Sequence, residues 1–489
     1  MCGIVGQLRT DGAPTDSSLV RSMCAALRHR GPDEEGFLFQ GALGLGMSRL
    51  RVLDLEGGRQ PMGNEDGSVQ VVFNGEIYNH QALRRKLIAR GHQLTTRSDT
   101  EVIAHLYEDE GLGCFSFLEG MFAIAIWDAR QEELILARDR LGKKPLFYAQ
   151  TSHGFSFSSE LTSLLCDTSI DRSINYKAID EYLSYLFVPH PLSIYANVTK
   201  MPPATWIVID EKSLFRTGSF WNVQLRSANE SYSTEDATEE LDVLLRSAVN
   251  KRLEADVPIG AFLSGGLDSS LIVAVMRSLG HEELRTFSVG FKESKFNELS
   301  HAATIARIFE TKHEEQVVDY DVEGLIPKLL HFFGEPFADS SAIPTYHLAE
   351  VTQNNVTVAL SGDGGDEIFG GYRRYSGRLL TDFYNRIPRW AGPGVAEWLL
   401  QRFREPEGYY GTNWRKAGRR FFEYASAVRE NPRTSWGFFL PKKRKMPFIR
   451  IFFRRCCNAV AVIQATIYTG NLHKMLAIKC FLQLIARRI

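Results

Sequence analysis

The chain has 489 residues, of which 44% are hydrophobic and 24% are charged, and its formal net charge at pH 7 is −1. This length favours two or more domains, and the composition is ordinary for a globular protein. The near-zero net charge argues against a nucleic-acid partner, and the absence of an 18-residue apolar run predicts no membrane-spanning helix.

The chain shows no sign of a secreted protein. Its first residues, MCGIVGQLRTDG, lack the charged and apolar regions of a secretory signal. The cysteines are odd in number and show no CxxC spacing: they are residues 2, 24, 114, 166, 456, 457 and 480. A reducing cytoplasm is the simplest compartment for such a chain.

Residues 1–205 are expected to form a mainly antiparallel β domain. VQVVF leads into Asn74-Gly75, a dipeptide favoured in tight hairpin turns. The apolar runs MFAIAIWD and LILARD are separated by the turn-like ARQE, and FYAQTSHGFSFSSE predicts a further hairpin. Residues 206–232 are expected to hold the last strand and a linker.

From residue 233 to 430 the predicted strands and helices alternate. Ser233 and Asp236 form a capping-box-like helix start. VPIGAFL, RTFSVGF, HEEQVVD and VTVALSG are typical of buried strands, and the helix SSLIVAVMRSL is expected to stop at Gly280. This order predicts a doubly wound parallel sheet whose ligand lies at the carboxyl ends of the strands.

The segment 431–489 has a different composition. It contains 12 Lys and Arg residues but no Asp or Glu, so the preceding residues hold 45 basic against 58 acidic residues, a net charge of −13. A basic surface tail is one interpretation. We favour another, in which foreign or out-of-frame sequence replaces a normal C-terminus, and we then expect poor packing against the rest.

Cys2 is a candidate nucleophile because removal of Met1 would make it the first residue, and its small side chain permits that removal. Its α-amino group, with a pKa of about 7.7–8.0, can then act as the general base for its own thiol. A chance position of the cysteine is the alternative while this residue is considered alone.

Three further segments supply what such a cysteine needs. In FNGEIYN, the amide of Asn74 and the N–H of Gly75 can donate to one oxyanion, although a plain hairpin turn is the alternative. Arg49, in SRLRVLD, can bind an α-carboxylate with two parallel bonds, and Asp99, in SDTE, can bind an α-ammonium. Each alone would be an ordinary surface charge, so the interpretation depends on their combination.

MCGIVG, RHRGPDEEG, SRLRVLD, FNGEIYN and RSDTE together resemble the class II, N-terminal-nucleophile glutamine amidotransferases. The resemblance implies that Cys2 attacks the side-chain amide of glutamine and releases ammonia, with Asn74 and Gly75 as the oxyanion hole. The residues that it implies for glutamine binding are Arg49, Asn74, Glu76 and Asp99.

A second motif, FLSGGLDSS at 262–270, leaves a predicted strand through a Gly-rich turn and enters a helix. Backbone N–H groups at such a helix start bind phosphate, and Asp268 can bind Mg²⁺ beside it. The motif is no Walker A loop, because GxxxxGK[ST] is missing. It resembles the pyrophosphate loop of the N-type ATP pyrophosphatases, which split ATP between the α and β phosphates.

SGDGGDEIFGGYRRY at 361–375 follows the predicted strand VTVAL, so it should lie at the same sheet edge. We expect Asp366 to supply the second carboxylate for Mg²⁺; the alternative is an acidic surface loop. The resemblance implies that Phe262 and Val289 contact the adenosine through backbone atoms. The full set expected to bind ATP is Phe262, Ser264, Gly265, Gly266, Asp268, Ser269, Val289, Ser361 and Gly362.

The pairing of both halves resembles the glutamine-dependent asparagine synthetases, as do YLFVPHP and KMPPAT. The resemblance covers roughly residues 1–430. It implies an αββα N-terminal-nucleophile sandwich, a doubly wound ATP pyrophosphatase domain and an ammonia channel. In the implied reaction, aspartate and ATP form β-aspartyl-AMP, and ammonia then displaces AMP. No nucleic-acid or membrane partner is expected, and a homodimer is compatible with the sequence.

Two features depart from the family pattern. Many members have Glu where this chain has Asp363, a catalytic candidate for acyl-adenylate formation, so the acceptor can be a carboxylate other than aspartate. The family segment D-x-x-S-M-x-x-x-x-E-x-R-x-P-F-L-D and a following Lys are missing, and Lys442, Lys443 and Lys445 are no convincing substitutes. A chain that retains only glutaminase activity therefore remains a further alternative.

Overall fold

The computed structural model describes residues 1–210, 215–224, 233–292, 297–318 and 322–387, together with 418, 421–422, 424–426 and 428–429. The chain divides into two compact units, Met1–Tyr182 with Leu186–Tyr375, and Leu183–Tyr185 with Ser376–Ile489. In the second unit, Tyr384 packs its ring against Phe421 and Phe422. The expectation of poor packing for 431–489 lies outside the described residues.

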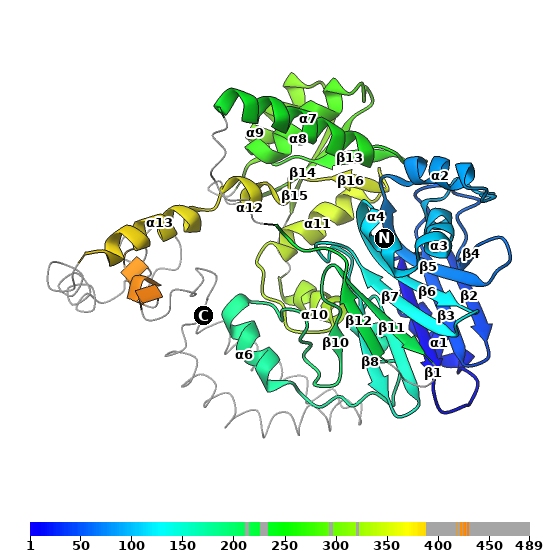
Figure 1. The fold of residues 1–489 in the computed structure, drawn as a ribbon. Coiled ribbons are helices and arrows are strands. Elements are labelled where there is room, and N and C mark those ends of the chain that lie inside the picture. The colour runs from blue at the N-terminus through cyan, green and yellow to red at the C-terminus, as the bar shows by residue number, and fades with distance from the viewer. Residues whose placement is uncertain are drawn as a thin grey trace. The chain divides into compact units, whose positions relative to one another are not determined.

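The N-terminal half, which the sequence predicts to be the amidotransferase domain, contains two six-stranded sheets (Figure 1). The first has the order β10-β8-β9-β1-β3-β2, with β1 Gly3–Arg9, β2 Glu34–Gln40, β3 Leu43–Arg49, β8 Phe147–Thr151, β9 Gly154–Ser158 and β10 Thr199–Lys200. The second has the order β12-β11-β7-β6-β5-β4, with β4 Met62–Gly63, β5 Val69–Ile77, β6 Gly120–Asp128, β7 Glu133–Arg138, β11 Thr205–Asp210 and β12 Phe215–Ser219. Neighbouring strands in both sheets are antiparallel.

Three apolar cores show how these sheets are layered. One core lies between the sheets, where Ile4 and Leu45 of the first face Val72 and Ala125 of the second. The other two cores join each sheet to its helices. The helices are α1 Ser17–Ala25, α2 His80–Ala89, α3 Asp99–Glu110, η1 Gly111–Gly113, α4 Cys114–Phe117, α5 Leu161–Leu164 and α6 Tyr176–Tyr185. Helix, sheet, sheet and helix layers confirm the predicted αββα sandwich.

The segment 206–232 differs from the expectation of one strand and a linker. It holds most of β11 and all of β12, which pair with each other as an antiparallel ribbon at the edge of the second sheet. Alternation of Ile207 and Ile209, both buried in the core between the sheets, explains why β11 joins this domain.

The synthetase half is built on a four-stranded parallel sheet with the order β15-β14-β13-β16. Helices α7 to α9 lie on one side of this sheet and α11 on the other (Figure 1), which confirms the doubly wound arrangement. The elements are α7 Thr234–Arg252, β13 Ile259–Phe262, α8 Leu267–Ser278, β14 Arg285–Phe291, α9 Leu299–Ile308, β15 Lys312–Val318, α10 Val322–Phe333, α11 Ala342–Thr352, β16 Val358–Leu360, α12 Gly365–Phe369 and α13 Arg373–Asn385.

The predicted start of α7 is confirmed. Ser233 is the N-cap residue, and its side-chain oxygen accepts a 3.0 Å bond from the backbone N–H of Asp236. Gly280 follows α8 with a φ of +88°, a conformation that favours glycine just after a helix. No helix in the described ranges has both the length and the apolar character needed to cross a membrane.

Candidate functional site

Cys2 lies immediately before β1 and is half-buried. Its thiol Sγ is 3.6 Å from the carbonyl oxygen of Leu50, and burial raises the pKa of the thiol. Arg30 fixes this end of the chain, because its Nε donates to the Cys2 carbonyl at 2.9 Å while its Nη1 pairs with Glu160 at 2.7 Å. The β1 register with β3 and β9 therefore presents the cysteine at a defined place.

One pocket brings together five of the residues that the sequence predicts to act on glutamine. Its lining includes Cys2, Arg49, Gly75, Glu76 and Asp99. These residues come from the chain start, the end of β3, β5 and the first turn of α3, so only the folded sandwich unites them.

The prediction of a hairpin turn at Asn74-Gly75 is wrong. β5 continues through both residues to Ile77, and they pair with Ala123 and Phe122 of β6. Glycine is needed at position 75 because a Cβ there would lie 2.1 Å from the carbonyl oxygen of Met121. Close approach of the neighbouring strand, and not a positive φ, accounts for this glycine.

The side chain of Asn74 is almost completely buried, yet neither its nitrogen nor its oxygen has a hydrogen-bond partner in the described part of the chain. Two residues earlier on β5, Val72 belongs to the core between the sheets, against which Cys2 also packs. Alternation along the strand points Asn74 to the same side. An unpaired buried amide on the side of β5 that faces the core against which Cys2 packs is suited to an oxyanion hole.

Arg49 is buried and already engaged in this structure. Its guanidinium pairs with Glu34 at 3.1 Å and donates to the carbonyl oxygens of Leu53 and Asp54 at 3.2 and 2.8 Å. The residue therefore shapes the 53–55 loop that borders the pocket. A carboxylate at this position would be bound by a cation that the protein holds in place.

Two acids line the same pocket, Asp99 buried and Glu76 half-buried. Burial raises the pKa of Asp99 to about 6, although its carboxylate accepts a 2.9 Å bond from the N–H of Ile77. Burial and the negative charge of Asp99 likewise raise the pKa of Glu76. Because burial works against the ionised form of both acids, a bound ammonium would be well compensated here.

Lys144 lies beside the start of the chain, and the sequence patterns did not single it out. Its side chain is buried, and its Nζ lies 3.1 Å from the sulfur of Met1. Burial lowers the pKa of Lys144, and the charge of Arg30 lowers it further. The pair Lys143-Lys144 precedes a proline in the sequence, but nothing in that pattern tells which lysine is buried.

In the synthetase half, the turn after β13 is ordered by its own serines. The hydroxyls of Ser264 and Ser269 lie 3.0 Å apart, and the N–H of Gly266 donates to the Ser264 hydroxyl at 3.2 Å. Gly265 has a φ of +79°. Gly266 is the N-cap of α8 and provides no side-chain cap, so the first N–H groups of this helix remain available to an anion.

The second glycine-rich loop contacts the first. A Cβ on Gly362 would lie 2.7 Å from the backbone nitrogen of Ser269, and one on Gly365 would lie 2.5 Å from Cγ of Asp268. This approach agrees with a shared site at the strand ends. Asp268 and Asp366, one residue beyond Gly365, are half-buried and have no ion-pair partner among the described residues.

The remaining predicted residues lie around the same sheet edge. Phe262 ends β13 and pairs with Phe287 of β14, while Val289 lies two residues further along β14. The hydroxyl of Ser361 donates to the exposed carboxylate of Asp363 at 3.0 Å. A local bond within the loop therefore orients the Asp363 carboxylate.

Comparisons with known proteins agree with both halves. A family model described as "Glutamine amidotransferase domain" matches residues 1–221, and one described as "Asparagine synthase" matches residues 240–480. A putative glutamine-hydrolysing asparagine synthetase 2 of Methanocaldococcus jannaschii is 38% identical over 80% of this chain and 79% of its own length. This chain belongs to the glutamine-hydrolysing asparagine synthetase family.

Other similarities are more partial. Asparagine synthetase 1 of Bacillus subtilis is 36% identical over 86% of this chain, which spans 66% of that relative's length. A solved glutamine phosphoribosylpyrophosphate amidotransferase from B. subtilis has 14% identity and a TM-score of 0.37, covering 69% of this chain and 94% of its own. For this member of the asparagine synthetase family, the matched range up to residue 480 overlaps the acid-free segment.

Proposed function

We propose that this chain makes asparagine from aspartate, ATP and glutamine, as its membership of the asparagine synthetase family supports. The observation that carries the proposal is the single pocket lined by Cys2, Arg49, Gly75, Glu76 and Asp99. A nucleophile, an oxyanion donor, a cation for a carboxylate and acids for an ammonium are the groups that glutamine hydrolysis requires.

In the amidotransferase half, Sγ of Cys2 attacks the side-chain amide carbon of glutamine. The amide of Asn74 and the N–H of Gly75 stabilise the tetrahedral oxyanion. After removal of Met1, the freed α-amino group of Cys2 takes the thiol proton and returns it to the leaving ammonia. Water then releases glutamate from the thioester.

Charged side chains orient the glutamine substrate in the amidotransferase half. Arg49 binds the α-carboxylate of glutamine, and Asp99 with Glu76 binds the α-ammonium. The bound ammonium favours the ionised form of both acids, because the cation offsets the effect of burial.

In the synthetase half, aspartate attacks the α-phosphorus of ATP, pyrophosphate leaves, and ammonia displaces AMP from the acyl-adenylate. The SGGLDSS turn and the start of α8 bind the pyrophosphate, with Ser264, Gly265, Gly266 and Ser269 as donors. Ser361 and Gly362, with the backbones of Phe262 and Val289, contact the nucleotide.

Asp268 and Asp366 would bind a Mg²⁺ ion, which neutralises charge on the phosphates when present. Their fit rests on oxygen-only chemistry and on partial burial without a cationic side-chain partner in the described ranges. Asp363 supports formation of the acyl-adenylate.

The testing experiment supplies ammonia directly, so that Cys2 is bypassed, and measures AMP, pyrophosphate and asparagine with aspartate as the acceptor. Formation of all three, together with a glutamine-dependent reaction that is lost in Cys2→Ala, supports the proposal. Glutaminase activity without aspartate-dependent AMP would contradict the synthetase half.

A ligase that acts on a different carboxylate is the second candidate, and Asp363 favours it. This acid is one methylene shorter than the Glu that many relatives have, so its carboxylate extends less far toward a bound acceptor. Pyrophosphate release with another carboxylic acid, but not with aspartate, would support this candidate.

We also propose a cytoplasmic location. Cys2, Cys24, Cys114 and Cys166 are all free thiols, which fits a reducing compartment. A homodimer without nucleic-acid or membrane partners remains part of the same proposal, and gel filtration with light scattering tests the oligomeric state.

A further inference from the structure

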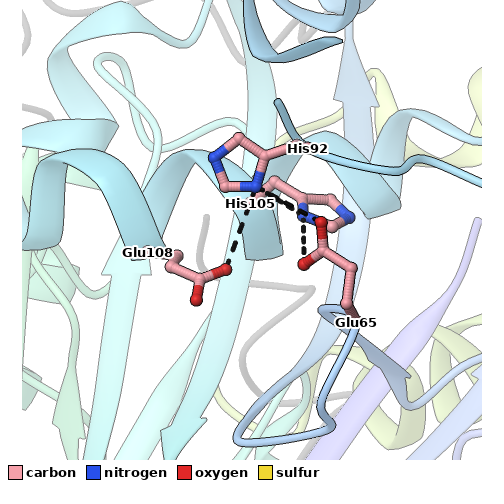
Figure 2. A group of neighbouring side chains, drawn as sticks. All are labelled: Glu65, His92, His105 and Glu108. Carbon is pink, nitrogen blue, oxygen red and sulfur yellow. Dashed lines mark hydrogen bonds and ion pairs between the residues drawn. The ribbon is translucent and has the colours of Figure 1, made fainter. Parts of the chain in front are cut away.

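A second group of polar side chains lies in the amidotransferase half, separate from the glutamine pocket. Figure 2 shows Glu65, His92, His105 and Glu108 pointing toward one another. They come from the β4–β5 connection, the α2–α3 connection and one face of α3. One ligand atom from each residue can be chosen so that all four lie within 4.8 Å of one another.

The distances among the two histidines and Glu65 are close to the edges of a tetrahedral metal site, and Glu108 lies further out. The Nδ1 atoms of His92 and His105 are 3.2 Å apart, and Nδ1 of His105 is 3.3 Å from Glu65 Oε2. His92 Nδ1 lies 3.5 Å from Glu65 Oε1 and 4.0 Å from Glu108 Oε2. Zinc with ligands at about 2.0–2.1 Å has tetrahedral edges of about 3.3 Å.

Outer hydrogen bonds orient three of these side chains. The other ring nitrogen of His92, Nε2, lies 3.0 Å from the carboxylate of Asp109. Asn64 donates to Glu108 at 3.1 Å, and the N–H of Gln93 donates to Glu65 at 2.8 Å. A carboxylate on the far nitrogen of a histidine is a frequent companion of metal ligands, since it fixes the ring and its tautomer.

The chemistry of the group also suits a divalent cation. His105 is 1% exposed, and burial lowers the pKa of this histidine. As metal ligands, two carboxylates and two imidazoles together carry a charge of −2, which one divalent ion balances. Two imidazole nitrogens favour zinc and related transition ions over Mg²⁺ or Ca²⁺, which prefer oxygen alone.

We propose that Glu65, His92, His105 and Glu108 bind one structural Zn²⁺ ion, or a similar divalent transition ion, with tetrahedral N2O2 coordination. The ion joins the β4–β5 connection and the α2–α3 connection to helix α3. Because α3 begins at Asp99 and β5 contains Gly75, this site braces the frame of the glutamine pocket without contacting the substrate.

The test uses the full chain, freed of metal with a chelator and titrated with Zn²⁺ by calorimetry. We expect one ion per chain bound at this site and a rise in melting temperature. Co²⁺ in place of Zn²⁺ should give the strong visible absorption of a tetrahedral site. His92→Gln and Glu108→Gln should each weaken binding at least tenfold.

His153→Gln is the matched control. This exposed histidine pairs only with Asp11 among the ion pairs described, so the variant chain should bind the metal as tightly as the parent does. His92 and Glu108 are chosen because they are partly exposed, so their variants should fold, and circular dichroism checks this. Zinc affinity unchanged in both variants would overturn the proposal. So would binding that is lost in Cys2→Ser, because the ion would then occupy the nucleophile.

Discussion

At the scale of single residues, replacing Asn74 should affect glutamine hydrolysis without lowering the stability of the fold. Its side chain has no partner among the described residues, so replacing it removes an unsatisfied polar group and leaves no new one. We expect Asn74→Ala to lower kcat for glutamine hydrolysis by about 10²–10³-fold with an unchanged or higher melting temperature.

Asn175→Ala is the control for this prediction. Asn175 caps α6 by accepting bonds from Lys177 and Ala178, so its loss should cost about 1 kcal/mol of stability and leave hydrolysis intact. Full hydrolysis in Asn74→Ala, measured as glutamate release, would remove Asn74 from the oxyanion hole.

The buried acid Asp99 predicts a pH dependence of glutamine binding. Burial raises its pKa to about 6, so the free protein loses the negative charge as the pH falls through that value. Ammonium binding needs the ionised form, and KM for glutamine should therefore rise below pH 6. Asp99→Asn should raise KM at pH 8 and flatten the profile. A flat profile in the parent chain would contradict the assignment, with KM measured from pH 5 to 8.

At the scale of elements, Gly75 is required by the pairing of β5 with β6. A Cβ at this position would lie 2.1 Å from the carbonyl oxygen of Met121, so Gly75→Ala must push the strands apart and displace the pocket. We expect a lower melting temperature together with a loss of glutaminase activity.

Gly113→Ala provides the comparison. A Cβ at Gly113 would meet nothing within 4 Å, and the φ of Gly113 is −67°, a value that alanine adopts without strain. That variant should be neutral or up to about 1 kcal/mol more stable. Equal melting temperatures for Gly75→Ala and the parent would show that β5 and β6 can relax.

How far the sequence predicts these elements depends on the range of the forces involved. Ser233 was predicted as a cap because its bond reaches only to Asp236, three residues away. The prediction of a turn at Asn74-Gly75 is wrong because long-range pairing with β6 overrides the local preference of the dipeptide. The cluster around His105 was missed because its members lie on three separate segments and match no metal-binding spacing.

The candidate sites divide in the same way. Motif resemblance identified Cys2 and Asp99 as partners in one pocket, which the structure brings together. It could not indicate that Arg49 is already paired with Glu34, or that Lys144 is buried beside the chain start. Those properties depend on which loops fold over a residue, and such contacts have no local signature.

At the scale of the whole molecule, one buried ion pair connects the two halves of the first compact unit. Lys200 lies in β10 of the amidotransferase sheet, and Glu335 follows α10 of the synthetase half. Glu335 also accepts a 3.3 Å bond from the N–H of Ile194. The exposed fractions of the two side chains are only 15% and 9%, so removal of one partner leaves an uncompensated buried charge.

Glu335→Gln should therefore destabilise the chain by about 3–5 kcal/mol, measured as a lower melting temperature. Glu283→Gln is the matched control, because the Glu283–Lys312 pair is largely exposed and such pairs contribute about 0–1 kcal/mol. The double variant Lys200→Met with Glu335→Gln should recover part of the loss, since the remaining ammonium is removed as well. If Glu335→Gln melts at the temperature of the parent, water reaches the Lys200–Glu335 pair, and the joint between the halves depends on other contacts.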